Sequence, residues 1–213
     1  MQKMQETPKR AISGAFYVII MLFGSSYSNL SCSLLFILLA IISIYEMWKL
    51  RKGKSKILPF LYIIIPFILI QILAYQMEGG WKSNLILFML ILTWTFDTFA
   101  YLIGVKIGKH KIFPSISPKK SWEGFLGGFF FSIITTYIIS QYIFIINMKL
   151  AAIIGILIPF TATLGDFIES KYKRDANKKD SGNIIPGHGG ILDRMDALMI
   201  TIPTIYIITN YFK

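Results

Sequence analysis

The sequence carries little charge for its length. Asp, Glu, Lys and Arg make up 15% of the 213 residues, whereas 54% are hydrophobic and the mean hydropathy is +0.60. Soluble domains contain about 25% charged residues, so this composition argues against a soluble globular protein. It also excludes intrinsic disorder, because disordered chains have too few apolar residues to form a core.

Residues that form disulfides or metal centres are scarce. Cys32 is the only cysteine, which excludes an internal disulfide and a cysteine-rich metal site. His110 and His188 are the only histidines, too few for a histidine-rich metal centre. Acidic residues number 11 against 22 basic ones, which gives a formal net charge of +11. In a membrane protein this excess is typical of basic cytoplasmic loops, so we expect no nucleic-acid partner.

Long apolar runs predict an all-α fold, a polytopic integral membrane bundle of about seven transmembrane helices. A spanning helix needs about 20 mostly apolar residues. The segments that qualify are Ala11–Leu30, Cys32–Trp48, Ile57–Met77, Asn84–Val105, Trp122–Asn147, Leu150–Phe167 and Ile191–Tyr211. A cleaved signal peptide over the first 26 residues is an alternative for the first segment, although no clear cleavage site follows. We expect a single membrane domain over residues 1–213.

Basic residues gather at one set of helix ends. Of the 22, 19 lie near residues 3–10, 49–56, 106–120 and 171–194. The opposite ends keep only Lys82, Lys149 and Lys213. The positive-inside rule places the basic ends in the cytoplasm. The sequence therefore predicts a multi-pass protein of the cell's inner (plasma) membrane, with Met1 and the active site facing the cytoplasm.

Among the acidic residues within or at the ends of the predicted spans are Asp97, Asp166, Glu169, Asp193 and Asp196. A charge inside a span costs about 2.5–3.5 kcal/mol and indicates function by default. Asp166 and Glu169 are three residues apart, as are Asp193 and Asp196, so each pair shares a helix face. Carboxylates beside basic loops suit a site for Mg²⁺ and polyphosphate. For Asp97, a structural ion pair is the alternative.

The glycine-rich stretch Pro186–Gly190 precedes the last predicted helix. Glycines let backbone amides converge on an anion, and a helix amino terminus attracts negative charge. The alternative is an ordinary tight turn. Asp193 can equally be a favourable first-turn acid. His188 is either a surface loop histidine or a contact to phosphate or base.

The loop Ile116–Gly124 leads into the fifth predicted helix. A purely structural interpretation accounts for it: Ser121 caps the helix, Trp122 lies in the aromatic belt, and Lys119 and Lys120 stay in the cytoplasm. Two glycine pairs favour close helix packing, and they are Gly104 with Gly108 and Gly124 with Gly128.

Taken together, these segments resemble the phosphatidate cytidylyltransferase family, also called CDP-diacylglycerol synthases. The segments that carry the resemblance are Asp97–Tyr101 with Gly104 and Gly108, Ser117–Gly124, Gly165–Arg174, Lys179–Gly182 and Ile185–Asp196. The resemblance is dense over residues 97–197, where the catalytic signature is concentrated. Many bacterial members are longer, and the region between Lys56 and Asp97 looks abbreviated here.

The resemblance implies a nucleotidyltransferase of phospholipid biosynthesis that makes CDP-diacylglycerol and pyrophosphate from CTP and phosphatidate. A phosphate oxygen of the lipid attacks the α-phosphorus of CTP. Because that oxygen is already anionic, catalysis is mostly positioning and charge neutralisation. The implied cofactor is Mg²⁺, with a second metal ion and a homodimer left open.

The resemblance also implies roles for individual residues. The expected catalytic residues are Asp166, Asp193, Lys179 and Arg194. The expected metal ligands are Asp166 and Asp193, followed by Asp196, Glu169 and Asp97. The expected substrate-binding residues are Lys119, Lys120, Lys173, Arg174, Gly187, His188, Gly189 and Gly190.

Two other functions remain as alternatives. One keeps the chemistry and changes the lipid, as in related archaeal enzymes that use an isoprenoid-ether phosphate. The other is an ion-coupled transporter, in which intramembrane acids also occur. The transporter does not account for the basic, glycine-rich loop after the sixth predicted helix.

Overall fold

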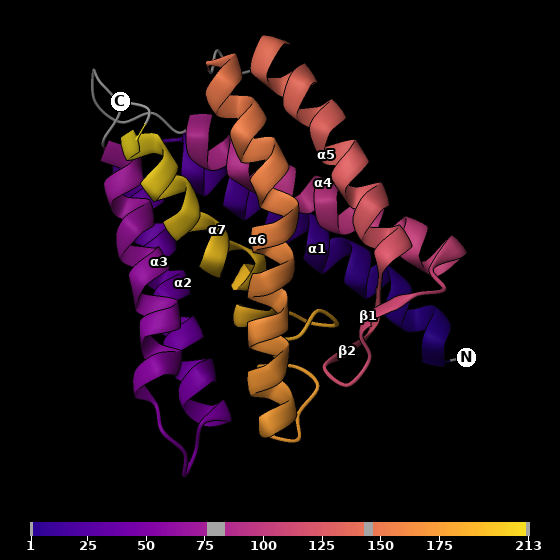
Figure 1. Ribbon diagram of the computed structural model, residues 1–213. Helices are drawn as coiled ribbons and strands as arrows, with labels where there is room; N and C mark the ends of the chain where they lie inside the picture. Colours follow the sequence, from indigo (N-terminus) through magenta and orange to yellow (C-terminus); the bar gives the residue numbers. More distant parts are fainter. Residues whose placement is uncertain (1, 76–83, 143–146, 212–213) are drawn as a thin grey trace. The chain divides into compact units, whose positions relative to one another are not determined.

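The apolar runs of the sequence form helices. The computed structural model describes residues 2–75, 84–142 and 147–211, with side chains from residue 12 onward. The helices are α1 (Gln2–Ser26), α2 (Asn29–Leu50), α3 (Ile57–Tyr75), α4 (Asn84–Ile107), α5 (Trp122–Tyr142), α6 (Met148–Asp175) and α7 (Leu192–Tyr211) (Figure 1). Within those ranges the only sheet is a ribbon of β1 (Lys111–Phe113) and β2 (Ser117–Ser121). The predicted all-α fold with about seven helices is confirmed.

Helices α2 to α6 are long and apolar enough to cross a bilayer. On α2, Leu34, Leu38 and Ile41 are each more than half exposed, whereas Phe36 and Leu39 on the other face are buried. Contiguous apolar surface of this kind is rare on soluble monomers and is typical of helices that contact lipid. The protein is therefore a multi-pass membrane protein. Helix α1 has a shorter apolar part, and α7 begins with several charged residues.

The described chain forms two compact units. The first comprises residues 1–83 and 172–196, and the second comprises residues 84–171 and 197–213. The long helices α6 and α7 each contribute to both. The single membrane domain expected from the sequence stays a prediction. Lys82, Lys213, residues 76–77 of the expected third span and residues 143–146 of the expected fifth span lie outside the described residues.

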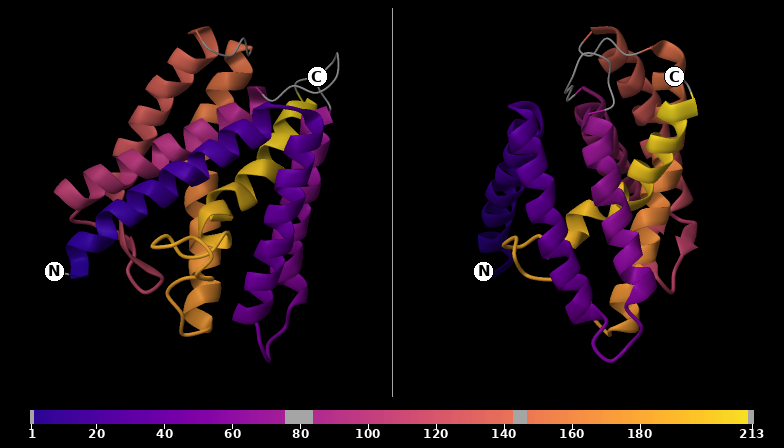
Figure 2. Two further views of the ribbon diagram at one scale, coloured as in Figure 1. Left: turned by 180° about the vertical axis from the view of Figure 1, so that it is seen from behind. Right: turned by 90° about the vertical axis from the view of Figure 1, so that its left-hand side faces the viewer.

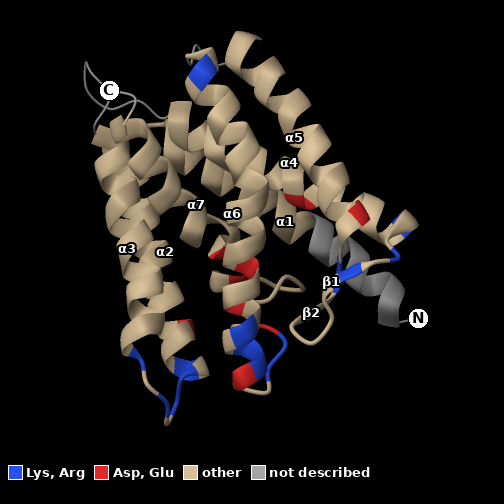
Figure 3. Ribbon diagram, viewed as in Figure 1, with Lys and Arg blue, Asp and Glu red and all other residues tan. Residues whose placement is uncertain are grey.

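In the first unit, α2 and α3 form an antiparallel hairpin, and they lie side by side in Figure 1 and in both views of Figure 2. The Phe36 and Phe67 rings pack across it, with centroids 6.5 Å apart. Basic residues mark the turn between the two helices (Figure 3). The weak boundary between the first two predicted spans lies at Ser28. Its hydroxyl accepts a hydrogen bond from the Ser31 amide at 3.0 Å and caps α2.

In the second unit, α4 and α5 pack closely through their glycines. A Cβ on Gly124 would lie 2.5 Å from the Ala100 carbonyl oxygen and 3.1 Å from the Gly104 Cα. A Cβ on Gly128 would lie 2.7 Å from the Phe96 ring. The close-packing interpretation of these glycines is confirmed. The predicted cap of α5 is also present, because the Ser121 hydroxyl accepts a hydrogen bond from the Gly124 amide at 3.2 Å.

Candidate active site

The glycine-rich segment between α6 and α7 folds into a tight turn within the first unit. The Ile185 amide donates to the Gly189 carbonyl oxygen at 2.9 Å, and the His188 amide donates to the Ile185 carbonyl oxygen at 2.9 Å. Gly187 and Gly189 have φ angles of 76° and 83°, which only glycine adopts without strain. The turn chemistry of the sequence is therefore present, and it shapes one wall of a cavity.

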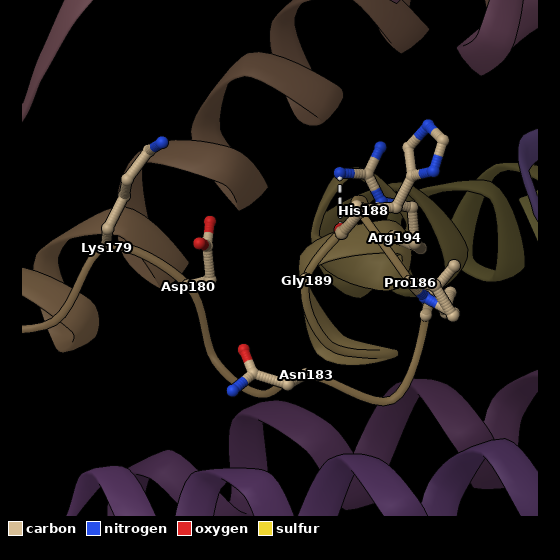
Figure 4. Close-up of a pocket in the computed structure, with 9 residues that line it drawn as sticks. Lys179, Asp180, Asn183, Pro186, His188, Gly189 and Arg194 are labelled. Carbon is tan, nitrogen blue, oxygen red and sulfur yellow. Dashed lines mark hydrogen bonds between the residues drawn. The ribbon is translucent and has the colours of Figure 1, made fainter. Parts of the chain in front are cut away.

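This cavity has a volume of about 580 Å³, and the first unit lines it with Lys179, Asp180, Asn183, Ile185, Pro186, Gly187, His188, Gly189 and Arg194. In Figure 4, Lys179 and Asp180 lie on one side of it, and His188 and Arg194 lie on the other. One Lys and one Arg face a single carboxylate there, so the lining is suited to an anion. Of the expected catalytic and substrate-binding residues, the pocket brings together Lys179, Arg194, Gly187, His188 and Gly189.

Hydrogen bonds hold the His188 region of the pocket in place. The Arg194 guanidinium donates to the His188 carbonyl oxygen from Nε at 3.2 Å and from Nη2 at 2.9 Å (Figure 4). The Ser13 hydroxyl of α1 donates to the Pro186 carbonyl oxygen at 2.9 Å and also lies 2.9 Å from His188 Nδ1. Because a hydroxyl has one proton and a carbonyl only accepts, we infer that Nδ1 of His188 carries a proton and donates to Ser13.

Asp193, an expected metal ligand, accepts hydrogen bonds on both carboxylate oxygens. Its Oδ1 lies 2.7 Å from Lys173 Nζ. Its Oδ2 accepts from the Ser181 amide and the Gly190 amide, each at 2.8 Å, and lies 2.9 Å from the Ser181 hydroxyl oxygen. Asp193 therefore orders the start of α7 and the loop before it, and its role as a metal ligand stays a prediction. Lys173, expected to bind substrate, is its ion-pair partner.

Glu46 is the residue that sequence reasoning missed. It lies on α2, is 2% exposed, and accepts hydrogen bonds from the Ile191 amide at 3.1 Å and the Leu192 amide at 2.9 Å. The Ser181 hydroxyl oxygen lies 2.8 Å from Glu46 Oε2 and 2.9 Å from Asp193 Oδ2, so its single proton is shared between the two carboxylates. A signal was present in the sequence, since Glu46 is an acid inside an apolar run, which is costly and indicates function.

In the second unit, Asp166 and Glu169 lie one turn apart on α6. Each offers a carboxylate oxygen, and the two oxygens lie within 4.8 Å of one another. Asp166 forms an ion pair with Lys120 of β2 and accepts a hydrogen bond from the Ser170 hydroxyl at 3.1 Å. Glu169 is fully buried. Two carboxylates at this spacing have the hard oxygen donors that Mg²⁺ prefers.

The remaining predicted site residues have other surroundings. Asp97 is an exposed residue in the middle of α4, and Lys119 is exposed on β2. The Arg174 guanidinium donates to the Lys178 carbonyl oxygen at 2.7 Å at the carboxyl end of α6. Asp196 lies one turn after Asp193 on α7. The roles expected for these residues stay predictions.

The expected amide cradle of Gly187–Gly190 is smaller than the sequence suggests. The His188 amide is used inside the turn, and the Gly190 amide donates to Asp193. An anion in the pocket would therefore be bound through Gly187 and Gly189, together with Lys179 and Arg194.

Comparison with known proteins defines the class. The model of the cytidylyltransferase family matches residues 54–212, so the chain belongs to this family. A protein of Staphylococcus haemolyticus (strain JCSC1435), named phosphatidate cytidylyltransferase, is 33% identical over 195 residues, which cover 90% of this chain and 75% of that protein. The family inferred from the motifs is thereby confirmed.

Two further relatives match over shorter segments. A phosphatidate cytidylyltransferase of Staphylococcus saprophyticus is 45% identical over 124 residues, and one of Staphylococcus aureus (strain COL) is 44% identical over 125 residues. Each match covers 58% of this chain and 48% of the relative, so the aligned part spans about half the length of these relatives.

Proposed function

We propose that this protein transfers the cytidylyl group of CTP to phosphatidate and forms CDP-diacylglycerol and pyrophosphate. The single observation that carries the proposal is the anion-binding pocket of Lys179, His188 and Arg194, formed by the signature segment of a chain that belongs to the cytidylyltransferase family. The names of the relatives support phosphatidate as the lipid substrate.

The reaction needs two anions to meet. A phosphate oxygen of phosphatidate attacks the α-phosphorus of CTP, a new P–O bond forms, and the bond to the β-phosphate breaks so that pyrophosphate leaves. The nucleophile is already anionic and requires no strong base. Lys179 and Arg194 neutralise phosphate charge on opposite sides of the pocket. The turn at Gly187 and Gly189 allows the backbone to approach phosphate oxygens closely.

The carboxylates of α6 suit a divalent cation. Asp166 and Glu169 present oxygen donors within 4.8 Å of one another, and Glu169 is buried where a cation would offset its charge. These two residues would hold Mg²⁺, with Asp193, Asp196 and Asp97 as further candidates. When bound, the cation supplies charge neutralisation for the triphosphate and the departing pyrophosphate. Lys120, paired with Asp166, orients that carboxylate.

The proposed site lies on the cytoplasmic side of the plasma membrane. The basic ends of the helices support this orientation through the positive-inside rule, and CTP is a cytoplasmic solute. The acyl chains of phosphatidate stay in the bilayer while its phosphate reaches the site. The lipid is thus presented at the membrane surface, and no soluble lipid carrier is required.

Position-specific label tests the reaction. Purified protein in mixed micelles with phosphatidate and Mg²⁺ should move label from [α-³²P]CTP into the lipid fraction and release label from [γ-³²P]CTP as pyrophosphate. Transfer of γ-label to the lipid would instead indicate a CTP-dependent kinase and overturn the assignment. Competition between phosphatidate and an isoprenoid-ether phosphate decides the lipid class, and we expect phosphatidate to be preferred.

A further inference from the structure

A buried carboxylate on α2 holds the loop that lines the pocket. Glu46 Oε1 accepts from the Ile191 amide at 3.1 Å, and Oε2 accepts from the Leu192 amide at 2.9 Å and lies 2.8 Å from the Ser181 hydroxyl oxygen. The Ile191 and Leu192 amides belong to the start of α7, where backbone N–H groups have no partner inside the helix. Glu46 therefore satisfies this helix start with a side chain from a distant helix.

The contacts of Glu46 fall at both ends of one loop. Ser181 lies near the beginning of the segment between α6 and α7, and Ile191 lies at its end. Asp193 joins the same two ends, because its Oδ2 accepts from the Ser181 and Gly190 amides and shares the Ser181 hydroxyl proton with Glu46. Two carboxylates thus meet at Ser181 and close the loop at its base. The residues between the two ends line the pocket.

The neighbouring glycines fit this carboxylate closely. A Cβ on Gly182 would lie 2.3 Å from Glu46 Oε1. A Cβ on Gly190 would lie 2.3 Å from Glu46 Oε2 and 2.2 Å from the Ser181 hydroxyl oxygen. Real Cβ atoms do not approach oxygen so closely. Neither position can carry a side chain while Glu46 stays in place.

We propose that Glu46 is a positioning residue for cytidylyl transfer, which holds the loop 181–192 in the conformation that binds the phosphates of CTP. What the pocket binds rests on the proposed function, whereas the anchoring of the loop does not. Glu46 acts through the loop. A loop ordered before the substrate arrives loses less conformational entropy on binding, so the effect of Glu46 falls mainly on the affinity for CTP.

The Glu46→Gln variant tests this role. The carboxamide has the size of the carboxylate but presents an NH₂ group where Leu192 or Ile191 donates, so at least one charge-assisted hydrogen bond is lost. We expect the KM for CTP to rise by about tenfold or more, the scale of such a loss. The KM for phosphatidate and kcat should change by less than about threefold, because the cost of ordering the loop is paid when CTP binds and is the same in the ground state and the transition state. Glu46→Asp keeps the charge, and its KM for CTP should lie between that of the wild type and that of Glu46→Gln.

Ser43→Ala provides the matched control. Ser43 lies one turn earlier on the same buried face of α2, and its hydroxyl oxygen makes no hydrogen bond within the described part of the chain. Its CTP KM should equal that of the wild type. If Glu46→Gln does not fold, Gly182→Ala applies the same test, because the added methyl displaces the Glu46 carboxylate.

Hydrogen–deuterium exchange without substrate gives a readout independent of activity. In Glu46→Gln, amides in residues 181–192 should exchange at least about tenfold faster, while peptides from α4 and α5 keep their wild-type rates. Unchanged loop exchange, or equally faster exchange everywhere with an unchanged CTP KM, would overturn the positioning role. If the wild type transfers no cytidylyl group, but residues 181–192 still exchange faster in Glu46→Gln than in the wild type, the proposed function fails and the anchoring of the loop by Glu46 stands.

Discussion

The ammonium group of Lys173 lies 2.7 Å from a carboxylate oxygen of Asp193, and the two side chains are only 10% and 5% exposed. The pair joins the last turns of α6 to the first turn of α7 within the first unit. Because both charges are withdrawn from water, the partnership matters more than that of a surface ion pair. Within the described part of the chain, Lys173, Gly190 and both the amide and the hydroxyl of Ser181 contact the Asp193 carboxylate, so its orientation is tightly defined.

Removal of Lys173 alone should be costly. Lys173→Met leaves the Asp193 charge buried without its cation, which lowers stability by about 3–5 kcal/mol. The double variant with Asp193→Asn should lose clearly less than the sum of the single variants. Thermal unfolding in detergent measures this coupling. The control is Asp175→Asn, because Asp175 is 43% exposed in its 3.5 Å pair with Arg51 and should contribute about 0–1 kcal/mol. Strict additivity would contradict the interpretation.

The α6 carboxylates should be required for turnover. Asp166→Asn and Glu169→Gln preserve side-chain size but remove the charge that a divalent cation needs. We expect cytidylyl transfer to fall at least about 100-fold in each, a loss typical of groups that act on charge in the transition state. Asp175→Asn, on the same helix and exposed, should stay near the wild-type rate. A near-wild-type rate for Asp166→Asn at saturating Mg²⁺ would place the metal elsewhere.

Metal removal should abolish activity. Two anionic substrates repel one another strongly in a site of low dielectric constant, so a divalent cation should be obligatory. EDTA should stop incorporation of [α-³²P]CTP label into lipid, and excess Mg²⁺ should restore it. Residual turnover in EDTA above the rate of a heat-inactivated sample would show that the cationic side chains suffice.

The glycine contact between α4 and α5 should tolerate substitution unequally. In Gly124→Ala the new methyl lies 2.5 Å from a backbone oxygen, so the helices must separate, and overpacking of this kind costs about 1–3 kcal/mol. In Gly104→Ala the methyl meets the Ser121 hydroxyl oxygen at 3.2 Å, a milder contact. The unfolding midpoint in detergent should therefore fall more for Gly124→Ala. Equal midpoints would show that the backbone adjusts freely.

The orientation in the membrane can be tested with single introduced cysteines, because the native Cys32 is buried and should label slowly. Lys54→Cys and Lys178→Cys should resist an impermeant maleimide applied to intact cells, since both positions belong to the basic, cytoplasmic set. Lys82→Cys and Lys149→Cys should react from outside. Labelling of all four after permeabilisation checks expression. External labelling at position 54 or 178 in intact cells would contradict the proposed orientation.

Much of the fold was predictable because bilayer thickness sets the length of an apolar helix. The expected span at Ile57 and the expected span at Asn84 begin at the first residues of α3 and α4. The β1–β2 ribbon was not predicted, because a three-residue strand is too short to show the alternation of apolar and polar residues that indicates a β-strand. The glycine loop and its basic residues were found from their order in the chain.

The contacts inside the candidate site were less predictable. The position of Glu46 inside an apolar run was a signal that was not used, but its partners could not be named because they are distant in sequence and only the folded chain brings them within hydrogen-bonding distance. Asp193 could be recognised as important from the sequence. Its hydrogen bonds with Lys173, Ser181 and Gly190 could not, because they depend on the conformation of an irregular loop that no repeating sequence pattern predicts. Local patterns thus locate helices and motifs, whereas the pairing of charges depends on tertiary packing.

The distance along the chain between Glu46 and its partners has a consequence for biosynthesis. Its hydrogen-bond donors lie 135, 145 and 146 residues later in the sequence. At about 5–20 residues per second, the ribosome needs roughly 7–30 s to make them after Glu46 has been added. Helix α2 must therefore enter the membrane with a carboxylate whose native partners do not yet exist. The contacts that hold the loop 181–192 form only after α7 has begun to be synthesised. A nascent chain that is arrested before this point has its earlier helices in the membrane but lacks a complete active site.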